Sequence, residues 1–361
     1  MGTLERTETL THRIGSNGRV SVKTITGNLR IRGVDGDDAR LSVTYRIRAT
    51  DQFSAERALE TGRVLVDRGP SSLEVETPER RLATGLAWLF GGARVGATIS
   101  LDVPWGTRVH YETMSGSIEA ATLVGDQKYR TVSGELTLWS LGGLVDAGSV
   151  SGSITLDRGG DVRLRANSVS GRIRARARRF HGLTVSTTSG GIAVVGEFDP
   201  SGDYRAESIS GTVDLTPLSG VTAELRAITG SIVSQVDNRV EGSRGYWRSI
   251  VGDGRSTFKV NTTSGNLRIL AALPGDTVGA DAPAPTPAGT DAAPSRTEPT
   301  DADAVLADTD RQVAGETWNP DEGSATPDEA ATDEELAVLQ ALERGEIDVD
   351  EAAERLDRAR H

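Results

Sequence analysis

The 361-residue sequence contains no cysteine, so it has neither disulfides nor thiolate ligands for a metal ion. Aromatic residues make up only 4% of the chain, and its four histidines, His12, His110, His181 and His361, have no metal-ligand spacing. The sequence also has no phosphate-cradling loop and no nucleophile elbow. It therefore predicts neither a cofactor nor a metal site, and we expect a protein that is not an enzyme.

Long apolar runs are missing as well. The N-terminal segment MGTLERTETLTHRIG is charged and lacks the apolar core of a secretory signal. The longest apolar stretch, LATGLAWLFGGA at residues 82–93, is too short and too rich in glycine to cross a bilayer. We therefore expect a cytoplasmic protein, with attachment to a membrane surface or a location at the cell surface left open.

Charge is distributed unevenly along the chain. The formal net charge is −12, yet residues 271–361 hold 23 of the 52 acidic residues and only 6 of the 40 basic ones. The preceding residues are therefore slightly basic. The sequence predicts a basic body joined to an acidic C-terminal arm, an asymmetry that bears on the choice of partners.

The chain contains a glycine that recurs within a fixed pattern of residues, which we call the frame. Consecutive glycines of the frame are 18 to 21 residues apart between Gly116 and Gly230. Such regular self-similarity is typical of a stacked repeat. The nine structural repeat glycines, each preceded by Ser or Thr, are Gly27, Gly116, Gly134, Gly152, Gly171, Gly190, Gly211, Gly230 and Gly265.

Apolar residues keep fixed offsets from these glycines. They recur two and four residues after the glycine, and two, five and seven residues before it, with the period of a strand on each side of a corner. In the repeat of Gly171 the predicted inward set is Leu164, Ala166, Val169, Ile173 and Ala175. We also expect the glycine itself to face inward, at a bend or a close approach of two backbones.

Each repeat is too short to contain a crossover helix and holds two short strands. Parallel coils about 4.8 Å apart would pair their backbones and bury their inner faces on each other. We predict an all-β fold, a single-chain β-solenoid of about 19-residue two-strand repeats over residues 111–270. Residues 1–110 would form the first repeat and an N-terminal β cap with a helical segment in DQFSAERALETG. The insertion between Gly230 and Gly265 would form a loop or hairpin.

The C-terminal residues divide into two further parts. Residues 271–331 are rich in Ala, Pro and Asp and predict a disordered linker. Residues 332–361 predict a helical hairpin, with a capping box at Thr332 and Glu335 and a stop at Gly345. We expect this hairpin to be a docking or oligomerisation module that uses Leu336, Leu339, Leu342, Ile347 and Leu356.

Two segments resemble known families. The repeated Ser-Gly frame, the segment SLDVPWGTRVHYETMSGSI and the closing TTSGNLRIL resemble the bacterial putative-adhesin family of β-strand-repeat domains of unknown function, over about residues 10–270. The C-terminal ELAVLQALERGEIDVDEAAERL resembles the short helical SHOCT-like domain. The first resemblance implies a binding role at a surface, and the second implies a small accessory module.

Five arginines occupy outward positions of one predicted coil. Such a stripe is typical of a surface that holds an anionic polymer or lipid headgroups, and it is equally compatible with a solvated sheet face. These residues are Arg163, Arg165, Arg172, Arg174 and Arg176.

The insertion supplies a second candidate surface. It combines Arg244, Tyr246, Trp247 and Arg248, a mixture that is enriched at recognition sites. The other interpretation is that Trp247 covers the end of the solenoid.

Together these observations predict a non-enzymatic, adhesin-like binding or scaffold protein. Its partner would be an unknown protein or an anionic surface or polymer, with self-association through the hairpin or the solenoid ends, and without specific recognition of nucleic acid. The alternative is a cytoplasmic or membrane-peripheral polymerising scaffold in an envelope-stress response.

Overall fold

The chain is mostly β, as predicted. The computed structural model describes residues 2–49, 52–78, 94–243, 245–276 and 311–319, in which all strands belong to one mixed sheet. The described part contains a single helix, α1 (Gln52–Gly62), and no helix there is long and apolar enough to span a membrane. The predicted C-terminal hairpin, the LAWLFGG segment and Arg244 lie outside the described residues.

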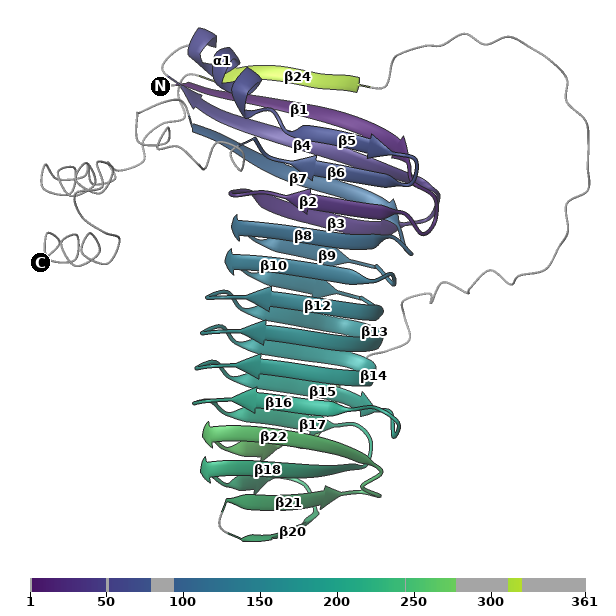
Figure 1. The fold of residues 1–361 in the computed structure, drawn as a ribbon, viewed down its shortest axis with the longest axis vertical. Helices are drawn as coiled ribbons and strands as arrows, with labels where there is room; N and C mark the ends of the chain where they lie inside the picture. The colour runs from purple at the N-terminus through teal and green to yellow at the C-terminus, as the bar shows by residue number, and fades with distance from the viewer. Residues whose placement is uncertain (1, 50–51, 79–93, 244, 277–310, 320–361) are drawn as a thin grey trace, which may run out of the picture. The chain divides into compact units, whose positions relative to one another are not determined.

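Two parallel ladders of strands lie face to face through most of the chain (Figure 1). In the order of pairing, the first ladder consists of β2 (Arg19–Lys23), β8 (Arg108–Ser115), β10 (Gln127–Ser133), β12 (Gly143–Ser149), the second halves of β13 (Ile154–Ser168) and β14 (Ile173–Thr187), β16 (Tyr204–Ser208), β22 (Ser256–Ser264) and β18 (Val221–Thr229).

The second ladder has the same order of repeats. It consists of β3 (Asn28–Val34), β9 (Ile118–Ala121), β11 (Leu136–Trp139), the first halves of β13 and β14, β15 (Ile192–Phe198), β17 (Val213–Pro217), β23 (Leu267–Ile269) and β19 (Ile232–Ser234). Each strand pairs with its counterpart in the neighbouring repeat, so that Tyr129 lies between Tyr111 and Ala147.

The order of pairing differs from the order of the sequence at the C-terminal end of the ladders. Strand β22, from the repeat of Gly265, pairs with β16 on one side and β18 on the other. The repeat of Gly265 therefore lies between those of Gly211 and Gly230. The intervening insertion forms a hairpin, β20 (Asn238–Ser243) and β21 (Tyr246–Val251), and β21 pairs antiparallel with β18. It is thus a paired hairpin that covers the last strand of the first ladder.

At the other end of the ladders, further strands extend the sheet, two of them in parallel pairing and the rest antiparallel. Strands β6 (Ser72–Glu76) and β7 (Arg94–Pro104) pair in parallel with β2 and β3. Strand β4 (Asp38–Ala49) pairs antiparallel with β7 and with β1 (Gly2–Arg13), and β5 (Leu65–Gly69) pairs antiparallel with β6. Helix α1 contacts β4 and buries Ala55 and Leu59.

One further strand comes from the segment predicted as a linker. Residues Arg311–Asn319 form β24, which pairs antiparallel with β1. Low hydrophobicity suggests disorder, but it does not prevent a segment from pairing through its backbone with the unpaired edge of another strand. The structure thus describes a paired strand within the segment that the sequence predicts as a linker.

Inward-facing side chains fill the space between the two ladders. The residues two and four positions after the repeat glycines and five and seven before them are buried in most repeats, as predicted. Aromatic rings pack edge to face in this interior, with the ring centroid of Phe198 5.0 Å from that of Tyr204 and 5.6 Å from that of Phe258. Tyr129 is fully buried, its hydroxyl donates to Gln127 Oε1, and burial raises its pKa far above the ordinary value.

The repeat glycines form a column in which successive backbones touch. A Cβ atom added to Gly171 would overlap the carbonyl oxygen of Gly152, and one added to Gly190 would overlap that of Gly171. The same relation holds along the order of pairing from Gly116 to Gly230. The predicted close approach of backbones is confirmed, and it explains why no other residue type occupies these positions.

Gly171→Ala should therefore destabilise the fold by at least about 1–3 kcal/mol, because the new methyl group must displace the backbone of Gly152 in the adjacent repeat. Denaturant unfolding measures this change. Gly160→Ala, within strand β13, is the matched control, since the nearest atom to its added Cβ is 3.9 Å away. Equal stability of the two variants would contradict the steric explanation.

Candidate binding surface

The corner between the two strands of a repeat is closed by a side-chain hydrogen bond. The peptide N–H of Gly152 donates to Ser149 Oγ (2.8 Å), and that of Gly171 donates to Ser168 Oγ (2.9 Å). Gly190 makes the same bond with Thr187 (3.1 Å). A hydroxyl that accepts from the backbone three residues later makes a tight turn. The two residues inside this turn are therefore directed outward.

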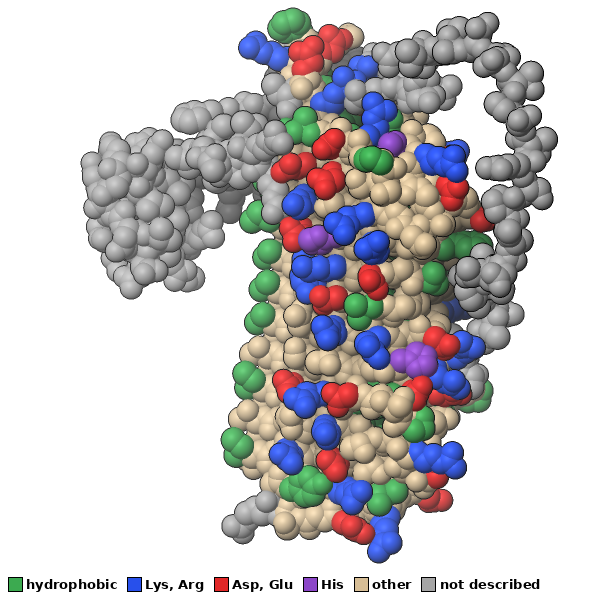
Figure 2. Space-filling view, turned by 45° about the vertical axis from the view of Figure 1, so that its right-hand side comes forward, with side chains coloured by type: hydrophobic (Ala, Val, Ile, Leu, Met, Phe, Trp, Pro, Cys, Tyr) green, Lys and Arg blue, Asp and Glu red, His purple; other side chains and the backbone are tan. Residues whose placement is uncertain are grey.

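This turn overturns one prediction. The residue two positions before each glycine was expected to face the interior, but Val150 is 46% exposed, Val169 49% and Ile228 80%. The alternation of the preceding strand ends at the hydroxyl, so the next residue no longer follows it. We call the resulting row the aliphatic ridge, which in order of pairing is Ile25, Met114, Val132, Val150, Val169, Thr188, Ile209, Thr263 and Ile228. Figure 2 shows hydrophobic side chains in a column along the left edge of the molecule.

The ridge is held in place by the backbone. The N–H of Val150 donates to the carbonyl oxygen of Val132 (3.2 Å), and that of Val169 donates to Val150 (3.1 Å). The same bond joins Thr188 to Val169 (3.1 Å). Parallel pairing thus continues through the corner, and neighbouring ridge side chains are separated by one strand spacing, about 4.8 Å.

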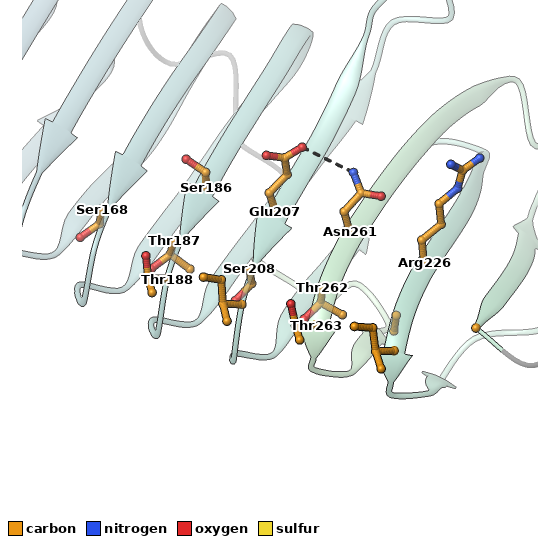
Figure 3. Close-up of a pocket in the computed structure, with 14 residues that line it drawn as sticks. Ser168, Ser186, Thr187, Thr188, Glu207, Ser208, Arg226, Asn261, Thr262 and Thr263 are labelled. Atoms are coloured by element: carbon orange, nitrogen blue, oxygen red, sulfur yellow. Dashed lines mark hydrogen bonds between the residues drawn. The ribbon is translucent and has the colours of Figure 1, made fainter.

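A groove of about 680 Å³ runs beside the C-terminal half of the ridge (Figure 3). Its floor consists of small side chains, mostly hydroxyls, such as Ser168 and Thr187. One wall is the ridge, and the other comes from the preceding outward positions. The residues of that second wall are Ser186, Glu207, Asn261 and Arg226, with Asn261 Nδ2 donating to Glu207 Oε1 (3.4 Å). None of the predicted binding residues that the structure describes lines this groove.

The five predicted arginines do not form a single stripe. Arg163 and Arg165 are exposed on the first ladder, in the second half of β13. Arg174 and Arg176 lie in the first half of β14, on the second ladder, and Arg172 directly precedes that strand.

Acidic residues also interrupt the basic charge. Arg176 pairs with Asp276 (3.1 Å) and lies 3.8 Å from Asp157, while Arg165 lies opposite Asp146 of the adjacent strand. Figure 2 likewise shows Lys and Arg interspersed with Asp and Glu.

The aromatic residues of the insertion lie on β21. Trp247 is half-buried and packs against the core, opposite Leu225 of β18. Tyr246 is 36% exposed, with the guanidinium carbon of Arg226 5.9 Å from its ring centroid. Arg248 is exposed and lies opposite Glu224. The hairpin therefore places Tyr246 beside Arg226 of the groove wall, and Trp247 against the end of the core.

The similarities of this chain to known proteins are distant. No protein-family model matches the chain. No curated protein matches it either.

Among solved structures, a putative cell adhesion protein from Clostridium sporogenes is 14% identical, with 73% of this chain and 99% of that chain covered and a TM-score of 0.24. A putative lipid binding protein from Parabacteroides distasonis is 14% identical, with coverage of 74% and 97% and a TM-score of 0.34. A putative adhesin from Parabacteroides merdae is 10% identical, with coverage of 74% and 97% and a TM-score of 0.28. At such low identities and TM-scores, we draw nothing about function from these likenesses.

A lysine substitution distinguishes ridge positions from core positions. Val169→Lys should change the free energy of unfolding by no more than about 0.5 kcal/mol, since the side chain is half exposed. Val185→Lys, at a fully buried position of β14, should cost more than about 3 kcal/mol because it buries an unpaired charge. Denaturant unfolding of both variants measures the difference. A large loss of stability in Val169→Lys would place this side chain in the interior.

Proposed function

We propose that this chain is a non-enzymatic, adhesin-like binding or scaffold protein that contacts its partner through the aliphatic ridge. In this proposal the two parallel ladders are the coils of a β-solenoid, and their regular stacking presents the ridge. The carrying observation is that no ridge position holds a charged residue, although six of the side chains are 45% or more exposed: Met114, Val132, Val150, Val169, Ile209 and Ile228.

The fold itself does not require aliphatic residues at these positions. Thr188 and Thr263 occupy the same place in their repeats and are exposed. A solvated turn position that accepts threonine also has room for other polar residues, so packing of the core does not account for Val, Ile and Met elsewhere in the row. Contiguous exposed apolar side chains mark interaction surfaces on soluble proteins.

The ridge is also suited to binding because it is ordered before any partner arrives. Its backbone is hydrogen-bonded from strand to strand, and valine and isoleucine have few side-chain rotamers to lose. A preorganised surface avoids part of the entropic cost of association. The surface contributed by one small side chain per repeat is narrow, so the binding energy must come from many repeats together.

Sedimentation with envelopes of the native host tests this function. The full chain should pellet with washed envelopes, and the double variant Val150→Lys/Val169→Lys should bind about tenfold more weakly or worse. The reason is that each buried, unpaired ammonium costs more than the roughly 1.4 kcal/mol that a factor of ten represents.

The matched control is Thr137→Lys/Thr155→Lys, which adds the same charge on paired residues of β11 and β13 in the second ladder. This control should bind as the unchanged chain does. The proposal fails if the unchanged chain stays in the supernatant, or if the two double variants bind equally well.

A further inference from the structure

We infer that the aliphatic ridge is covered by a second copy of this chain, which lies antiparallel to the first and crosses it at a small angle. This inference rests on the proposed function, since it names the partner of the same surface. It follows from the spacing of the ridge and from the groove beside one half of the ridge.

The spacing favours a partner built in the same way. Ridge side chains recur once per strand, about every 4.8 Å, over nine strands. A partner whose side chains had another period would meet only a few of them in register. A second copy has the same period throughout, so every strand level along the row meets a strand level of the partner copy in the same register, as in the dry interfaces between identical β-sheets.

The groove indicates the direction of the second copy. It accompanies the ridge from the repeat of Val169 to that of Ile228. In an antiparallel pair with its two-fold axis at Val169, the other half of the ridge, Met114 to Val150, lies over the groove of the partner copy. The relation is reciprocal, as a two-fold interface requires. A parallel pair would place ridge over ridge and leave both grooves empty.

One attractive and one like-charge contact would flank this pair, and Arg130 already pairs with Asp146 of its own chain (2.7 Å). Arg130 stands four residues before Gly134, and Glu207 stands four residues before Gly211 on the same side of the ridge. These are the third and seventh repeats of the stack, so an antiparallel pair centred on Val169 brings Arg130 of one copy near Glu207 of the other. At the far end of the interface, Lys23 of one copy approaches Arg226 of the other, and this is a like-charge pair that solvent screens. The ridge itself contributes no charge that would have to be desolvated.

The length of the ridge sets the width that a stable pair needs. Eight strand spacings of about 4.8 Å make the ridge about 38 Å long. A stable interface buries about 800 Å² on each partner. A strip of that length reaches this area at a width of about 20 Å, so the interface must include the groove and the flanking side chains as well as the ridge.

Because the chain has no cysteine, single cysteines can locate the second copy without background. We expect Val169→Cys, at the two-fold axis, to be joined into covalent dimers by a short bismaleimide. Met114→Cys and Thr263→Cys should be joined mainly when the two variants are mixed. Thr155→Cys, on the second ladder, is the control and should remain monomeric. Denaturing gels of the full-length variants report each outcome.

Monomeric Val169→Cys would overturn the inference. Cross-linking of Met114→Cys to itself as efficiently as to Thr263→Cys would also overturn it, since this result requires a parallel pair.

Sedimentation equilibrium without a cross-linker supplies an independent test. The unchanged chain and Thr137→Lys/Thr155→Lys should be dimers, and Val150→Lys/Val169→Lys should be a monomer. Dimers that survive the ridge substitutions would form through another surface and would overturn the inference. If the unchanged chain is a monomer while the ridge variant still loses envelope binding, the proposed function stands and the second copy does not. If the ridge pair forms but envelopes are not bound, the second copy stands as the partner of the ridge and the envelope does not.

Discussion

The whole stack depends on the contact between the glycines of neighbouring repeats. The α-carbon of each glycine lies so close to the carbonyl oxygen of the previous one that no side chain fits between them. This contact brings the corners of neighbouring repeats to the same separation as their strands. Both ladders can therefore continue around one corner without a gap, and the interior between them is closed on that side.

The same corner accounts for the exposed apolar row. The Ser or Thr hydroxyl that accepts the glycine N–H, as in Ser168 and Gly171, turns the chain and leaves two residues outside. One of them is a hydroxyl residue and the other is aliphatic in most repeats. A structural requirement of the stack, glycine with a hydroxyl three residues earlier, therefore also sets the position and the spacing of the ridge.

Much of the fold could be predicted from the sequence, because inward positions such as Ala166 and Ile173 alternate strictly along their strands. Val169 could not be placed by alternation alone, since its apolar character suggests burial; the recurring Ser or Thr before it was the signal of a turn. The position of β22 between β16 and β18 could not be predicted either. Repeats that share one frame can pair in more than one order. The groove residues Glu207, Asn261 and Arg226 belong to different repeats, and only this order brings Asn261 between the other two.

Hydroxyl-radical footprinting at low and high protein concentration tests the central claim most directly. The account predicts that ridge residues such as Met114 and Val150 are oxidised in dilute solution and protected in concentrated solution, where the second copy covers them. Inward residues such as Val145 and Leu156 should be protected at both concentrations. Ridge residues that are protected even in dilute monomer would contradict the outward corner, and ridge residues that react equally at both concentrations would contradict the covering copy.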